Sequence, residues 1–142
     1  MSSHYRTELQ MNPTAVDVSW LEDQLRTYNR SQVANPVRLE FLITLTDRET
    51  NLVGGVFAKV SYGWLFIDAL WIAEAIRGKG EGRKLLHRAE EQALQHGCQN
   101  AWVDTFSFQA RGFYERHGYV IFGDLPDYPP GHMRYFMRKR LV

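Results

Sequence analysis

The 142-residue sequence predicts one mixed α/β domain, residues 1–142, whose sheet is mostly antiparallel. Three segments rich in β-branched and aliphatic residues, 37–46, 52–62 and 64–73, follow one another with only short turns between them, as in an antiparallel meander. A glycine-rich turn, a helix-like segment and another strand-like run come next. Because a strand–helix–strand unit favours a right-handed parallel crossover, we expect one parallel strand pair in the middle of the sheet.

The other elements follow from local patterns. Residues 6–11 predict a first strand, and apolar residues at helical spacing predict a helix over residues 16–33. The helix after the glycine-rich turn spans residues 83–96, and its buried face holds Leu85, Leu86, Ala89 and Ala93. The remaining prediction, in chain order, is a strand at 101–108, a short helix at 109–117, and strands at 119–123 and 133–141 joined by a proline-rich loop.

Composition excludes several classes of protein. The 17 Lys and Arg residues nearly balance the 16 Asp and Glu residues, so no global field attracts nucleic acid or an acidic membrane. The longest apolar run is too short to span a bilayer, and the N-terminus lacks the apolar centre of a signal peptide. The single cysteine, Cys98, cannot form an internal disulfide and is predicted to be a small buried residue. We therefore expect a cytoplasmic protein without nucleic-acid or membrane partners.

The first segment that suggests a binding function is the run Arg-Gly-Lys-Gly-Glu-Gly-Arg at residues 77–83. Glycines between a strand and a helix let backbone N–H groups approach a phosphate, and the helix N-terminus adds partial positive charge. The spacing fits neither the P-loop nor the dinucleotide-binding fingerprint. Taken alone, the run is equally consistent with a flexible turn.

A second segment lies at residues 107–119, beginning where a strand ends. Phe113 is predicted to be a core residue of a short amphipathic helix, whereas Tyr114 carries a phenol that could donate a proton into a cleft. The alternative is that both aromatic side chains serve only the core.

Together the two segments resemble the GNAT superfamily of N-acetyltransferases. Its acetyl-CoA signature is matched by Arg77, Gly80 and Gly82, and its later signature by Ala110, Phe113, Tyr114, Gly118 and Tyr119. The order of elements agrees over nearly the whole chain, and residues 104–110 are also similar to a bacterial subgroup of small single-domain members. The resemblance implies the GNAT fold, in which the central parallel strands splay apart and helices flank the sheet.

The resemblance also implies a donor site for acetyl-CoA. The pyrophosphate would lie on the backbone amides of Gly78, Lys79, Gly80, Glu81 and Gly82, with Arg77, Lys79 and Arg83 supplying positive charge. The pantetheine arm would pair with the backbone of Leu70, Trp71 and Ile72 and contact the segment of Ser107 and Ala110. Many members have Asn where this chain has Ser107, and a hydroxyl can make only one of the two amide contacts.

The implied mechanism is direct attack of an amine on the thioester, with Tyr114 as the general acid and a backbone N–H near Ile72 stabilising the oxyanion. Asp68 interrupts an apolar strand, where an unpaired carboxylate is costly, and is the first candidate for the general base. The alternative for Asp68 is a structural carboxylate. Glu74 and ordered water are the other candidates for the base.

The expected acceptor is a primary amine of a small molecule; a protein or peptide amine is the alternative acceptor, and a non-catalytic acyl-CoA sensor is the alternative function. Glu74, Tyr128 and His132 are the candidate acceptor-binding residues. The five histidines lack the spacing of metal ligands, so no metal is expected. Homodimerisation is an expectation from the family. The basic residues of the last strand, Arg134, Arg138, Lys139 and Arg140, fit a solvated face, a site for the 3′-phosphate of CoA, or a site for an acidic substrate equally well.

Overall fold

The computed structural model describes residues 4–34 and 37–142, and the chain divides into two compact units, residues 1–36 and 37–142. In the first unit, α1 (Ala15–Gln32) confirms the predicted helix, and the Thr14 side chain accepts a hydrogen bond from the Asp17 amide at 3.5 Å as its N-cap. The predicted strand at residues 6–11 is wrong: this stretch has no regular secondary structure. A strand needs a neighbouring strand to bind its backbone groups, and within the described residues no strand pairs with residues 6–11.

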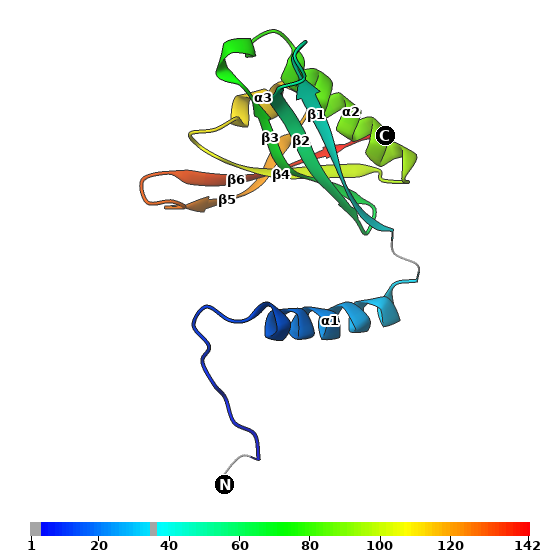
Figure 1. Ribbon diagram of the computed structural model, residues 1–142, viewed down its shortest axis with the longest axis vertical. Coiled ribbons are helices and arrows are strands. Elements are labelled where there is room, and N and C mark those ends of the chain that lie inside the picture. Colours follow the sequence, from blue (N-terminus) through cyan, green and yellow to red (C-terminus); the bar gives the residue numbers. More distant parts are fainter. Residues whose placement is uncertain (1–3, 35–36) are drawn as a thin grey trace. The chain divides into compact units, whose positions relative to one another are not determined.

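The second unit contains a six-stranded sheet in the order β1-β2-β3-β4-β6-β5 (Figure 1). All neighbouring strands are antiparallel except β3 and β4, which are parallel, so the predicted mixed fold is confirmed. The strands are β1 (Arg38–Thr46), β2 (Leu52–Ser61), β3 (Trp64–Ile72), β4 (Asn100–Phe106), β5 (Val120–Pro126) and β6 (Met133–Arg140). The proline-rich connection is shorter than predicted, because β5 continues to Pro126, which lies opposite Met133.

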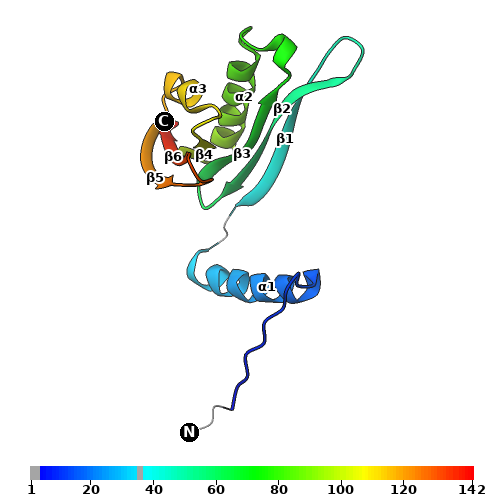
Figure 2. The same cartoon turned by 90° about the vertical axis from the view of Figure 1, so that its left-hand side faces the viewer.

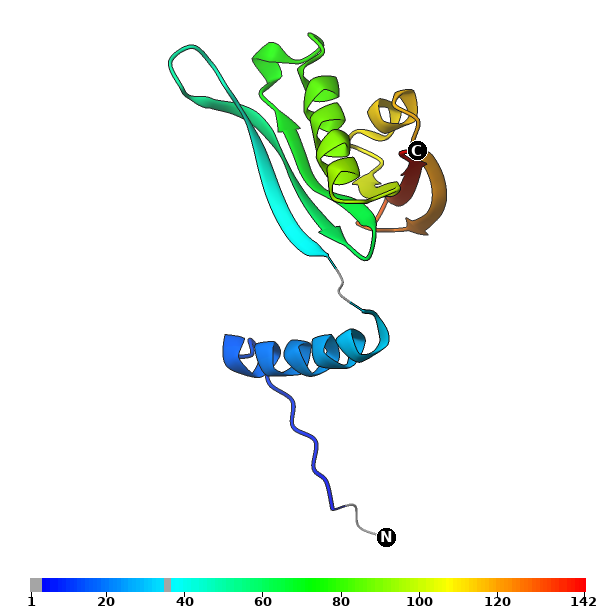
Figure 3. The same ribbon diagram turned by 90° about the vertical axis from the view of Figure 1, so that its right-hand side faces the viewer.

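The core lies between the sheet and two helices, α2 (Glu81–Gln95) and α3 (Arg111–Arg116), seen in Figures 2 and 3. The predicted buried face of α2 is confirmed, and Cys98 is buried as expected. The buried side chains are Val56, Ala58, Val60, Leu65, Ile67, Leu85, Leu86, Ala89, Ala93, Cys98, Ala101, Val103, Tyr114, Tyr119 and Met137. None of the helices within residues 4–34 and 37–142 is both long and apolar enough to cross a membrane.

The parallel strands separate halfway along their length. Their last paired residues are Ile67 and Val103, although β3 continues to Ile72 and β4 to Phe106. The separation begins at a β-bulge: Phe57 of β2 pairs with Ala69 and the next residue pairs with Ile67, so Asp68 is the extra residue. Beyond the bulge, β3 still pairs with β2 on one side, and within the described residues no strand pairs with its other edge. This arrangement is the splayed strand pair implied by the family resemblance.

Candidate active site

A cleft of about 850 Å³ occupies the space between the diverging ends of β3 and β4. Its walls also include the glycine turn, the first turn of α2 and the buried side of α3. The lining residues include Asp68, Leu70, Trp71, Ile72, Arg77, Gly78, Gly80, Gly82, Arg83, Asp104, Phe108, Ala110 and Tyr114. Most of the predicted donor-binding residues and both predicted catalytic residues therefore line one cavity.

The glycine turn has the backbone conformation that only glycine adopts readily. Gly78 and Gly80 have φ angles of 77° and 86°, and a Cβ at either position would meet no atom within 4 Å. These positions thus need glycine for its conformation and not for space. Gly80 is the N-cap of α2, and the Lys84 amide donates a hydrogen bond to the Gly80 carbonyl at 3.2 Å. The amides of the first helical turn have no earlier carbonyl of the helix to bind, so they are available to an anion.

Arg77 has a structural partner that the sequence did not predict. Its Nε donates a hydrogen bond to the Ile72 carbonyl at 2.7 Å, and its guanidinium lies 6.0 Å from the centre of the Trp71 ring. Arg77 therefore ties the glycine turn to the end of β3. Lys79 does not line the main cleft but faces a neighbouring pocket of about 450 Å³, which Gly80 and Arg83 also line.

Tyr114 presents a protonated phenol to the cleft. The side chain is 5% exposed and makes edge-to-face contacts with Phe113 and Tyr119, at centroid distances of 5.2 and 5.6 Å. Burial raises the pKa of Tyr114 to about 12, with a smaller contribution from the negative charge of Asp104. Within residues 4–34 and 37–142 its hydroxyl has no hydrogen-bond partner, so it is free to bind a ligand in the cleft.

Tyr119, whose ring contacts that of Tyr114, belongs to a buried polar network. Its hydroxyl donates to Glu90 Oε2 at 2.8 Å, and Lys139 Nζ lies 3.0 Å from Oε1 of the same carboxylate. Glu90 is only 6% exposed. Burial, together with the adjacent Glu90 charge, raises the pKa of Tyr119 well above its ordinary value. The network fixes the ring against which Tyr114 packs.

We expect Lys139→Met to lower the free energy of unfolding by about 2 to 4 kcal/mol, because it leaves the Glu90 carboxylate buried without its cation. Chemical denaturation measures the change. Lys84→Met is the matched control: Lys84 pairs with Glu81 on the surface, where its side chain is 70% exposed, and its loss should cost no more than about 0.5 kcal/mol. Equal effects of the two substitutions would show that the buried network adds no stability.

The two candidate bases lie in different surroundings. Asp68, the bulge residue, lines the cleft, and its Oδ2 lies 3.1 Å from Lys59 Nζ. Its side chain is 35% exposed and paired with Lys59, so the carboxylate is neither buried nor without a partner. Strand alternation accounts for the exposure, since Asp68 lies on the face opposite the buried Leu65 and Ile67. Glu74 begins the short 3-10 helix Glu74–Ile76 and does not line the cleft.

The Ser107 hydroxyl faces the loop before β6. It accepts a hydrogen bond from the Met133 amide at 3.1 Å and lies 3.3 Å from His132 Nδ1. Ser107, Tyr128 and His132 do not line the cleft, whereas Ala110, the other predicted residue of this segment, does. A donor contact by Ser107 and acceptor contacts by Tyr128 and His132 stay predictions.

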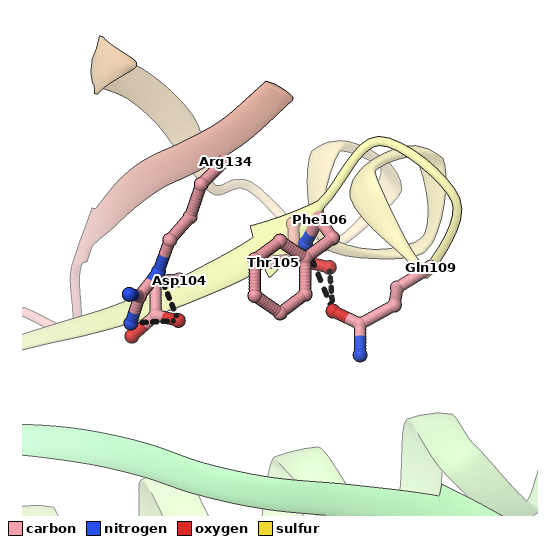
Figure 4. A network of polar contacts seen from close by, with 5 residues as sticks. All are labelled: Asp104, Thr105, Phe106, Gln109 and Arg134. Atoms are coloured by element: carbon pink, nitrogen blue, oxygen red, sulfur yellow. Dashed lines mark hydrogen bonds and ion pairs between the residues drawn. The ribbon is translucent and has the colours of Figure 1, made fainter. Parts of the chain in front are cut away.

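Sequence reasoning missed a polar arrangement at the end of β4 (Figure 4). Arg134 donates to Asp104 Oδ1 from both Nε and Nη2, at 3.0 and 2.8 Å. Further along the chain, Gln109 Oε1 accepts hydrogen bonds from the Phe106 amide at 2.8 Å and from the Thr105 hydroxyl at 3.3 Å. These bonds hold the strand end and the turn into α3 in one geometry. Asp104 in the middle of a β-strand was the only signal in the sequence that could have revealed the arrangement.

A splayed parallel strand pair beside a glycine turn and a helix N-terminus, with a phenol in the resulting cleft, defines an enzyme of the acyltransferase class. The chain belongs to the acetyltransferase (GNAT) family, whose model matches residues 5–119. The predicted family and fold are thereby confirmed.

Curated relatives and solved structures agree with this assignment. The chain is 40% identical over 119 residues to blasticidin-S acetyltransferase of Streptomyces morookaense, covering 82% of this chain and 88% of the relative. It is 32% identical over 120 residues to acetyltransferase Atu2258 of Agrobacterium fabrum, covering 84% and 88% of the two chains. The crystal structure of an acetyltransferase from Bacillus cereus is similar over 94% of this chain and 97% of its own, with 33% identity and a TM-score of 0.86.

Proposed function

We propose that this protein transfers the acetyl group of acetyl-CoA to a primary amine of a small molecule. The observation that carries the proposal is the coincidence of three features in one cleft: the glycine turn, the free edge of β3 and the buried phenol of Tyr114. The similarity to a blasticidin-S acetyltransferase supports a small-molecule acceptor over a protein amine.

The residues present fit acetyl-CoA, which would supply the activated acetyl thioester. The positive-φ glycines and the first amides of α2 would hold its pyrophosphate, with Arg83 adding positive charge. The edge of β3 at Leu70, Trp71 and Ile72 that no strand covers within the described residues would pair with the amide groups of the pantetheine arm, although the Ile72 carbonyl is bonded by Arg77. Arg77 contributes by fixing the turn against Ile72.

Tyr114 is the proposed general acid. Its raised pKa keeps the proton on the phenol oxygen throughout the neutral range, and its hydroxyl has no competing partner within the described residues. The general base is either Asp68, which lines the cleft, or ordered water; Glu74 is less well placed because it lies outside the cleft lining. Homodimerisation and a cytoplasmic location stay predictions.

The test of the proposal measures CoA release from acetyl-CoA with a thiol reagent, across a panel of small primary amines and one lysine peptide. We expect at least one small amine to accelerate release by tenfold or more over the background, to about the 1 to 10³ s⁻¹ that is typical of enzymes. A thermal shift with acetyl-CoA but no acceleration by any amine would instead identify a non-catalytic acyl-CoA sensor. Preference for the lysine peptide would identify a protein acetyltransferase.

A further inference from the structure

Three aromatic side chains form a stacked array beside the cleft. Phe106 is stacked with Phe108 at a centroid distance of 5.2 Å and an interplanar angle of 6°, and with Tyr128 at 5.8 Å and 24°. Phe108 is 56% exposed and Tyr128 is 45% exposed. Single exposed aromatic residues are common, but Phe108 is an exposed ring that lines the cleft and is stacked on a second ring, which indicates a binding surface. We call Phe106, Phe108 and Tyr128 the ring array.

The ring array is held in place by Arg134 and His132. The Arg134 guanidinium lies 4.8 Å from the centre of the Tyr128 ring and 5.6 Å from that of Phe106, and both of its hydrogen bonds to Asp104 end on Oδ1 (Figure 4). His132 contacts Phe108 edge-on at 4.9 Å. The array is thus preorganised, so little side-chain entropy would be lost when a ligand binds to it.

Asp104 connects the ring array to the reaction site. It follows Val103, the last residue of β4 that pairs with β3, and both Asp104 and Phe108 line the cleft that contains Tyr114. Within the described part of the chain, Asp104 Oδ2 receives no hydrogen bond. Asp104 also pairs with Arg134, so the Arg134 charge at this rim is compensated.

We propose that the acceptor is a primary amine attached to a planar ring, with the ring stacked on Phe108 and the ammonium group bound by Asp104. The inference rests on the proposed function and adds the chemical class of the acceptor. A planar ring gains most from exposed parallel aromatic faces, since offset stacking adds to the area that is buried. A carboxylate oxygen without a donor is the partner that an ammonium group needs before it loses a proton and attacks.

The experiment compares benzylamine with cyclohexylmethylamine, which have the same carbon skeleton but differ in the planarity of the ring. We expect Phe108→Leu to reduce the wild-type ratio of kcat/KM for benzylamine to that for cyclohexylmethylamine by about threefold to tenfold. Phe122→Leu is the matched control, because Phe122 is 52% exposed and does not line the cleft, whereas Phe108 does; it should keep the wild-type ratio. Comparing the ratio between the wild-type and variant proteins cancels the difference in basicity of the two amines, since that difference is the same for every protein.

Asp104→Asn separates the two halves of the proposal. The amide oxygen can still accept from Arg134, so the pair should stay together, while KM for both amines should rise by about tenfold or more. A ratio of the two amines that Phe108→Leu leaves unchanged would overturn the proposal while leaving the acetyltransferase function intact; absence of turnover with every amine would overturn both.

Discussion

Tyr114→Phe should lower kcat by about 100-fold or more, which is the usual contribution of a positioned general acid. The substitution removes only the hydroxyl, and the ring would keep its contacts with Phe113 and Tyr119. The affinity for acetyl-CoA and the melting temperature should therefore stay close to those of the wild-type protein. Steady-state kinetics, calorimetric titration and thermal denaturation measure the three quantities.

The pH profile supplies a second readout for Tyr114. Burial raises its pKa from 10.0 to about 12, so the proton-donating form is present below that value and is lost as the pH rises through it. We expect no decline of kcat that is attributable to Tyr114 below about pH 11, where an ordinary phenol would already be ionised.

Tyr119→Phe is the matched control for Tyr114→Phe. The Tyr119 hydroxyl binds Glu90 and does not line the cleft, so its removal should cost about 1 kcal/mol of stability and change kcat by no more than about threefold. If Tyr114→Phe retained wild-type kcat, or if both variants lost activity to the same extent, Tyr114 would not be the general acid.

Gly80→Val is expected to raise the dissociation constant for acetyl-CoA by about tenfold to 100-fold. A β-branched residue is strained at a φ of 86°, and relieving that strain would move the amides at the start of α2 away from their common direction. The added side chain itself would meet nothing within 4 Å, so the effect must come from the backbone. Calorimetric titration with acetyl-CoA measures the change.

Gly63→Val is the matched control, because it introduces the same backbone strain at a turn outside the proposed acetyl-CoA site. Gly63 has a φ of 79°, its Cβ would also meet nothing within 4 Å, and it lies in the turn at the opposite end of β3. Both variants should lose about 1 to 2 kcal/mol of stability, but only Gly80→Val should lose affinity for acetyl-CoA. Equal affinities of the two variants would show that the glycine turn does not hold the donor.

Regular elements of the fold could be predicted because their signals are local. The apolar alternation and turn residues between positions 37 and 73 predicted three strands, and the 3.6-residue spacing of α2 predicted its buried face. The segment at residues 6–11 has a similar local pattern, yet it forms no strand. Strand formation depends on a partner elsewhere in the chain, and a window of six residues contains no information about that partner.

The candidate site was predictable only in part. The glycine turn and Tyr114 belong to short motifs, and the resemblance identified them without any knowledge of the tertiary structure. Asp104 and Arg134 are 30 residues apart, and only the pairing of β4 with β6 brings them together. The engagement of Ser107 with Met133 depends on the same pairing.

The sequence alone determined that the chain has a mixed α/β fold, a glycine-rich turn before a helix and a candidate acid, because these depend on residue types at fixed short spacings. The tertiary structure decided which groups share the cleft. Lys59 of β2 pairs with the Asp68 carboxylate within the otherwise apolar run, and the end of pairing after Ile67 and Val103 opens the cleft. The tertiary structure also places Asp104 beside the ring array at the rim of the cleft. Register and strand separation arise from the packing of the whole sheet, so no local pattern encodes them.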